Sequence, residues 1–258
     1  MIQVYGGYIL WVGLFWCNLL YGQLISLPGW YYENPVGNSC IYSVGIAERY
    51  SDDNKSFSAA REDGVANLIR SVNVRIRSGS AQYAEGSSIK FKEFVVEEVD
   101  SELHRKVDDR AVVLDSLLVR KQAIVLIGWR KERSGSPDSC AIPKAFFKII
   151  ADQSMQPRWV HSDYHKEGYI YGIGMSKAFS GLARSWNESA KNGRLEIAKQ
   201  ISVSLSNLEY HYNDGRNFEN SWMDEAVDVI LDGARVAKRY YDIEQDIYYT
   251  LVEYPYKE

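Results

Sequence analysis

This chain of 258 residues has few cysteines and histidines and lacks the short motifs that usually reveal a reaction. Its three cysteines include no CxxC pair, which argues against a zinc site or a thioredoxin-type site. There is no G-x-S-x-G, no P-loop and no Cys/His pairing of the kind that activates a nucleophile. We therefore predict no catalytic, cofactor-binding or metal-binding residue, no cofactor and no enzymatic activity.

The chain also lacks an excess of positive charge. The net charge is -4 and the pI is near 5.7, which argues against nucleic acid as the main partner because such a partner needs a basic face. The six prolines and the lack of any low-complexity run argue against a disordered chain. With 46% apolar and 25% charged residues, the composition is that of a soluble globular protein.

The first charged side chain is Glu33, and the uncharged stretch before it contains an apolar block at residues 9–20. This block is shorter than the ~20 apolar residues that span a bilayer. It suits the apolar region of a secretory signal with Gly22 before the cleavage point, so residues 1–22 are predicted to be a signal peptide. The alternatives are an unprocessed apolar strand and an incorrectly chosen start codon, because no Lys or Arg lies near the start.

The cysteines bear on the compartment. Cys17 lies in the predicted leader, which leaves Cys40 and Cys140 in the mature chain. An oxidising compartment would allow these two to form a disulfide, provided that the fold brings them within reach. The sequence leaves that pairing open.

The strongest pattern in the chain is a passage that occurs twice. Pro28-Gly29-Trp30 opens the first copy and Pro157-Arg158-Trp159 opens the second. Six pairs of residues are each 129 positions apart: Trp30 and Trp159, Tyr42 and Tyr171, Gly45 and Gly174, Ser51 and Ser180, Phe57 and Trp186, Gly64 and Gly193. This period is far longer than that of solenoid repeats, so each copy is predicted to be a small domain. The predicted repeat domains are 28–133 and 157–258, joined by a linker at 134–156.

Each copy predicts a strand, a helix and a closing hairpin. In the first copy a strand is expected at 41–47, a helix with apolar spacing follows, and two β-rich runs at 111–119 and 123–129 close the unit. The second copy closes with runs at 234–243 and 247–254. The helix ends are ambiguous, and a change from helix to strand is expected within 72–76 and within 201–205. The predicted fold is α+β, with a small sheet covered by one main helix in each copy.

Two details of the copies refine this fold. Gly64 and Gly193 lie inside the predicted helices at equivalent places, which indicates close packing of the helix on the sheet. The charged stretch 97–110 is expected to be a solvated helix or loop, and 145–150 a short helix. Residues 133–138 have the composition of a boundary.

Several side chains could suggest chemistry, and each has a simpler explanation. Gly172 and Gly174 lack the third glycine of a dinucleotide loop. A metal site in the loop before the second strand would use His161, Asp163, His165 and Glu167, but a solvated loop explains them better. Acidic residues at helical spacing are expected to form a solvated face: Asp224, Glu225, Asp228 and Asp232. Trp30 and Trp159 are interpreted as anchors that seat the incoming chain, rather than as ligand-stacking rings.

The order P-x-W, short loop, Y-x-x-G strand, Ala-rich helix and closing hairpin resembles a bacterial family of small membrane-associated lipoproteins of the Lpp-twenty type. This family includes flagellar outer-membrane proteins and the N-terminal domain of flagellar assembly protein T. The resemblance covers 28–133 and 157–258, and it implies two dodecin-like strand-helix-strand-strand domains, export to the cell envelope and no established enzymatic activity. Trp16 before Cys17 departs from a lipobox, so release after Gly22 is favoured over lipidation.

These observations predict a non-enzymatic envelope protein, periplasmic, outer-membrane associated or secreted, that acts as a structural or interaction module. Expected partners are envelope proteins or a second copy of the chain, with peripheral membrane association as a further option and no small-molecule substrate. The alternative is a dodecin-like module that binds a small aromatic ligand, which the tyrosine-rich strands suggest.

Overall fold

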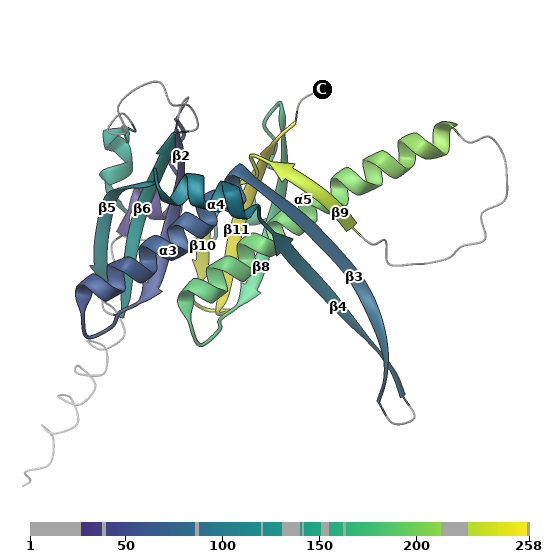
Figure 1. Ribbon diagram of the computed structural model, residues 1–258, viewed down its shortest axis with the longest axis horizontal. Coiled ribbons are helices and arrows are strands. Elements are labelled where there is room, and N and C mark those ends of the chain that lie inside the picture. The colour runs from purple at the N-terminus through teal and green to yellow at the C-terminus, as the bar shows by residue number, and fades with distance from the viewer. Residues whose placement is uncertain are drawn as a thin grey trace, which may run out of the picture.

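The computed structural model describes residues 27–37, 40–85, 88–119, 121–130, 140, 142–150, 155–161, 164–212 and 227–256. The predicted leader at 1–22 and the boundary at 133–138 lie outside these residues. The fold is α+β, as the sequence predicts, with small antiparallel sheets and helices packed on them (Figure 1). Among the described residues, no helix is both long enough and apolar enough to cross a membrane.

The first unit consists of one helix on a three-stranded sheet. Its elements are β2 (Cys40–Glu48), α3 (Asp53–Val72), β5 (Val112–Val119) and β6 (Gln122–Arg130). The strands lie in the order β2-β6-β5, and every pairing is antiparallel. Asp52 caps α3, since its carboxylate accepts a hydrogen bond from the Asn54 N–H at 2.9 Å. Alternate residues of β2 and β6 pack against α3, which explains the apolar pattern of both strands.

The second unit has the same order of elements. It consists of β8 (Tyr169–Lys177), α5 (Leu182–Tyr212), β10 (Arg235–Asp242) and β11 (Ile247–Pro255). Its strands lie in the order β8-β11-β10, the counterpart of β2-β6-β5. The expected change from helix to strand within 201–205 is wrong, because α5 continues to Tyr212 and projects beyond the sheet (Figure 1). In the first unit the change occurs at Asn73, within the predicted five residues.

A third sheet joins the two units. The hairpin of β3 (Asn73–Glu85) and β4 (Ser88–Glu98) follows α3, and β3 also pairs with β9 (Val227–Asp232), which follows α5. The expectation of helical spacing is therefore wrong for Asp228 and Asp232, which lie on a strand; Asp224 and Glu225 are outside the described residues. The charged stretch at 97–110 contributes α4 (Ser101–Asp108), which packs beside α3 through the buried Val107 and the partly buried Leu103.

Glycines allow both helices to lie directly on their sheets. A Cβ on Gly45 would come within 2.0 Å of the Ala60 carbonyl oxygen in α3, and one on Gly174 within 1.8 Å of the Ser189 carbonyl oxygen in α5. No L side chain fits at such distances from backbone, so only glycine permits this approach. The recurrence of glycine in the sequence thus reports a packing requirement, as predicted.

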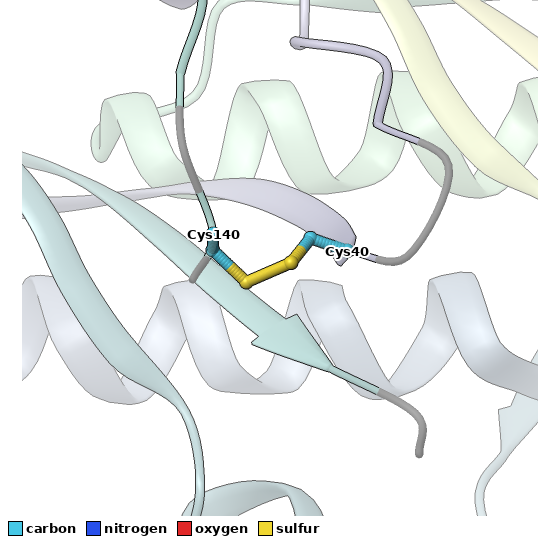
Figure 2. The surroundings of a disulfide bond; sticks show 2 residues. All are labelled: Cys40 and Cys140. Atoms are coloured by element: carbon cyan, nitrogen blue, oxygen red, sulfur yellow. A yellow bond between two sulfur atoms is a disulfide. The ribbon is translucent and has the colours of Figure 1, made fainter. Parts of the chain in front are cut away.

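The other face of the first sheet is covered by residues from two distant parts of the chain. On one side are β1 (Leu27–Pro28), paired with β7 (Ile149–Ile150), and the short helix α2 (Gly29–Tyr32), which carries the fully buried Trp30. On the other is the segment containing Cys140 and the 3-10 helix η2 (Lys144–Phe147), within the region expected to form a short helix. A disulfide joins Cys140 to Cys40, with 5.8 Å between the Cα atoms (Figure 2). It fastens this cover to the start of β2.

The corresponding face of the second sheet has a lighter cover. The 3-10 helix η3 (Arg158–Val160) places Trp159 against Tyr240, Tyr249 and Leu251. Both tryptophans thus pack on the sheet face opposite the main helix, in keeping with their interpretation as anchors. Trp30 also donates a hydrogen bond from Nε1 to the Asp115 carboxylate at 2.9 Å.

Candidate functional site

Most side chains singled out in the sequence do not meet at one place. His161 Nε2 lies against the Gln156 side-chain oxygen, while Asp163 is outside the described residues. Within the described part of the chain, no group of three or more His, Cys, Asp or Glu side chains could hold a metal ion. Gly172 and Gly174 are buried under α5, where a Cβ on Gly172 would lie 2.0 Å from the Gly193 carbonyl oxygen. A phosphate has no access to that backbone.

A buried polar cluster lies at the junction between the two units. Asp63 on α3 accepts hydrogen bonds from Asn187 Nδ2 of α5 at 2.7 Å and from the Ile46 N–H of β2 at 2.8 Å. Burial raises the pKa of the Asp63 carboxyl above its ordinary range, and the two hydrogen bonds oppose that rise. The carboxyl is thus a shielded acceptor that links both helices to the edge of β2.

Arg239 on β10 enters the same junction from the second unit. Its guanidinium is buried and donates to Asn34 Oδ1 at 2.8 Å and to the Tyr31 carbonyl oxygen at 3.3 Å. Burial lowers the pKa of Arg239 to about 10. The indole of Trp186 donates to the Tyr31 hydroxyl at 3.0 Å, so α2 is tied to both β10 and α5.

A second buried cluster attaches the β3–β4 hairpin to both helices. Glu97 of β4 pairs with Arg194 of α5, with Nε and Oε1 2.6 Å apart, and with Arg70 of α3 at 3.0 Å. Arg194 is only 1% exposed. A buried arginine without a partner is costly, so this triad specifies where the hairpin sits relative to the two units.

These polar residues were not found by the sequence analysis. One signal was available in the sequence. Asp63 lies 129 residues before Asn192, so the first copy has a carboxylate at a helix position where the second copy has an amide. Asn192 donates to the Met175 carbonyl oxygen at 2.8 Å, on the outer edge of β8, and no strand pairs with that edge among the described residues. In the first unit the matched edge belongs to the junction.

Two open hollows lie near these groups. One of about 430 Å³ lies between the covers of the two sheets and is lined by Tyr32, Phe146, Trp159, Lys238 and Arg239, among others. The other, of about 510 Å³, follows the outer edge of β8 and α5. Both are wide and partly polar, with room for a planar molecule or a peptide.

Tyrosines line the hollow beside β8. The Tyr164 and Tyr171 rings meet edge to face with centroids 4.9 Å apart, and Tyr169 lies 6.3 Å from Tyr171. Although Tyr171 is only partly buried as a residue, its hydroxyl oxygen is shielded from solvent and lacks a hydrogen-bond partner. Burial and then the charge of Glu253 raise the pKa of Tyr171 to about 12.

Part of this chain is similar to a known protein family. Residues 157–254, which include the second unit except Pro255, match the family model described as LPP20 lipoprotein. No curated protein matches the chain. No solved structure matches it either. The match supports a similarity of this segment to the Lpp-twenty type of family, and it falls on the segment expected to be the second copy.

Proposed function

We propose that this protein is an exported, non-enzymatic component of the bacterial cell envelope that acts as a structural or interaction module. In this proposal its two units are tandem dodecin-like copies of one strand-helix-strand-strand domain. The match of 157–254 to LPP20 lipoprotein supports an envelope role, and the Cys40–Cys140 disulfide supports an oxidising compartment outside the cytoplasm. Periplasmic or outer-membrane residence, and a role beside the flagellum, rest on the family resemblance alone.

The interaction role is carried by the free side of β4. In the sheet β4-β3-β9, no described strand pairs with the outer edge of β4. The apolar side chains of Phe94, Val96 and Val99 are exposed along this strand and just beyond it. Unpaired edges with exposed apolar residues accept a strand from another chain, because backbone hydrogen bonds and side-chain burial then act together.

Photo-crosslinking in the native envelope tests this role. A photoreactive amino acid at Val96 should give a discrete adduct with an envelope protein or with a second copy of the chain. The same group at Glu62, on the outer side of α3, serves as the control and should give no such adduct. If both positions react equally or neither reacts, the β4 edge is not the interaction site. Recovery of the chain from the cytoplasm with reduced Cys40 and Cys140 would overturn the envelope role itself.

A second candidate is the binding of a small aromatic ligand. The hollow beside β8, which is lined by Tyr164, Tyr169 and Tyr171, is the observation in its favour. Flavins and related planar molecules should then raise the melting temperature, because a ligand that binds only the folded state stabilises it by mass action. The Tyr164→Ala variant should lose much of that increase, because it removes an exposed ring from the hollow. A wild-type protein without any shift at saturating ligand would exclude this candidate.

A further inference from the structure

The loop between the first strand and the main helix is built in the same way in both units. The Tyr50 N–H donates to Ser56 Oγ at 2.8 Å, and the Phe179 N–H donates to Ser185 Oγ at 2.8 Å. Each serine in turn donates to a carbonyl oxygen four residues earlier, that of Asp52 or Gly181. These bonds hold each aromatic residue at a defined height above the first turn of its helix.

A cation lies on each of the two rings. Lys55 Nζ is 4.8 Å from the centroid of Tyr50, and Arg184 Cζ is 4.4 Å from the centroid of Phe179. Tyr50 is 43% exposed and Phe179 is 40% exposed, and neither ring belongs to a buried apolar cluster. The hydrogen bonds of the serines hold the loops in place without any contribution from the rings. Neither loop structure nor core packing therefore explains why both positions carry an aromatic residue.

Both pairs lie at one end of the molecule, together with the turns of the two closing hairpins. Arg49 N–H donates to the Lys121 carbonyl oxygen, and Ala178 N–H donates to the Asp246 carbonyl oxygen. An open hollow of about 600 Å³ lies between the loops. Ile243, in the turn between β10 and β11, is 77% exposed. We call this surface the loop end; it comprises residues 49–55, 121, 178–184 and 243–246, and both strand-to-helix loops are seen at the lower left of Figure 1.

The charges of the loop end balance. Asp53 pairs with Arg49 at 3.1 Å, and the Asp52 carboxylate caps α3. In all, the loop end carries four cations and four anions: Arg49, Lys55, Lys121 and Arg184 against Asp52, Asp53, Glu244 and Asp246. A polyanion such as nucleic acid would need an excess of positive charge. Exposed aromatic rings beside Lys and Arg on a nearly neutral surface are instead the composition found where proteins meet phospholipid head groups.

We propose that the loop end docks on a phospholipid surface. Tyr50, Phe179 and Ile243 enter the head-group region, and Lys55 and Arg184 contact lipid phosphates from their positions over the rings. This inference deepens the proposed envelope function and rests on it for the presence of a membrane. The duplicated loop thus provides two equivalent contacts, which set the orientation of both sheets relative to the bilayer.

The test uses an environment-sensitive fluorophore at each end of the full chain. Ile243→Cys carries the label at the loop end, and Tyr256→Cys carries it beyond the far end of β11; both variants also contain Cys17→Ser. With phosphatidylcholine vesicles containing phosphatidylglycerol, the emission at position 243 should rise and shift to the blue, while position 256 should not change. This comparison reports which end touches lipid even if the apolar residues 9–20 also hold the chain on the vesicle.

A second pair of variants measures the contribution of the rings. Tyr50→Ser with Phe179→Ser should weaken vesicle binding by roughly tenfold if that end makes the contact, because binding strength scales with buried apolar area. Phe147→Ser, which removes an exposed ring elsewhere, is the matched control and should leave binding unchanged. Circular dichroism and a melting curve establish that the double variant is folded.

Equal responses at 243 and 256, or no response at 243, would overturn the lipid proposal. So would a response at 243 that requires an envelope protein in place of lipid. If the chain is found in the envelope and the label at position 243 does not respond to vesicles, only this inference fails. If the loop end binds vesicles and the chain is not exported, the proposed function fails and the lipid-binding surface stands.

Discussion

In the first unit, Trp30, the disulfide and residues from two parts of the chain cover the sheet face opposite the helix. In the second unit, Trp159 and one short turn cover the matched face. The strand order, the helix placement and the glycines at the crossing are nevertheless the same. Close backbone approach leaves no alternative to glycine, whereas an apolar sheet face can be covered by many side chains. The features that the two units share are therefore those that depend on close contacts between backbones.

The largest expected effect is on the feature that both units share. Gly45→Ala and Gly174→Ala should each lower the free energy of unfolding by about 4 kcal/mol, above the usual cost of overpacking because the new Cβ meets backbone atoms. Urea denaturation of each variant measures this. Gly181→Ala is the control, since its Cβ would meet only the Glu48 side chain at 3.5 Å. A large loss in one unit alone would mean that the two crossings are not equivalent.

The next effect should be confined to the feature that only the first unit has. Cys40 and Cys140 are 100 residues apart, and replacing both by serine should cost about 3 kcal/mol by freeing the unfolded chain. Hydrogen exchange should show the loss of protection in β2 and in the 142–150 cover, with little change in β8 and β11. Uniform loss in both units would show that the cover also supports the second sheet.

A smaller effect is expected where the units are joined. Arg194→Met should cost about 2 kcal/mol, because Glu97 keeps Arg70 as a partner but remains mostly buried. Lys199→Met, which removes an exposed pair with Glu196, should change stability by less than about 0.5 kcal/mol. Thermal unfolding of the two variants compares them directly. If the two variants are equally stable, the triad of Glu97, Arg194 and Arg70 does not hold the hairpin in place.

The smallest effect is a dependence on pH. Because burial raises the pKa of Asp63, the folded state binds more protons than the unfolded state between the ordinary aspartate pKa and the raised value. Stability from this group should therefore fall as pH rises through that interval. Asp63→Asn should flatten this part of the stability profile, as measured by urea denaturation at a series of pH values. Asn192→Asp, at the matched and less buried place, should not create such a slope; a steep slope there would show that position is as shielded as the junction.

Much of the fold was predictable because local patterns reported it. The period of 129, the paired glycines and the apolar runs predicted the strands, helices and closing hairpins of both units. The sheet of β4, β3 and β9 was not predictable, since the pairing of β3 with β9 joins residues far apart and all three strands lie in the middle segments, where the copies differ. The continuation of α5 to Tyr212 was missed because Ile201-Ser202-Val203-Ser204-Leu205 alternates like a strand.

The candidate sites were less predictable than the fold. Trp30 and Trp159 were recognised as anchors from their recurrence, but Asp63, Arg239 and Glu97 acquire their roles only through partners on other elements. A single polar residue in a helix gives no sign of the side chain that will bury it. The aromatic and cationic residues of the loop end do recur at the period of 129, in Tyr50 and Phe179 and in Lys55 and Arg184, so the sequence held that signal.

The pairing of β3 with β9 also determines when the third sheet can form during folding. Arg75 on β3 forms an ion pair with Asp228 on β9, 153 residues later in the chain. One edge of the β3–β4 hairpin therefore stays unpaired until nearly the whole polypeptide has been made. Contacts of such long sequence separation form slowly, because the intervening chain loses entropy before the strands gain hydrogen bonds. In a chain that crosses a membrane unfolded, the third sheet would therefore be completed only after β9 has crossed.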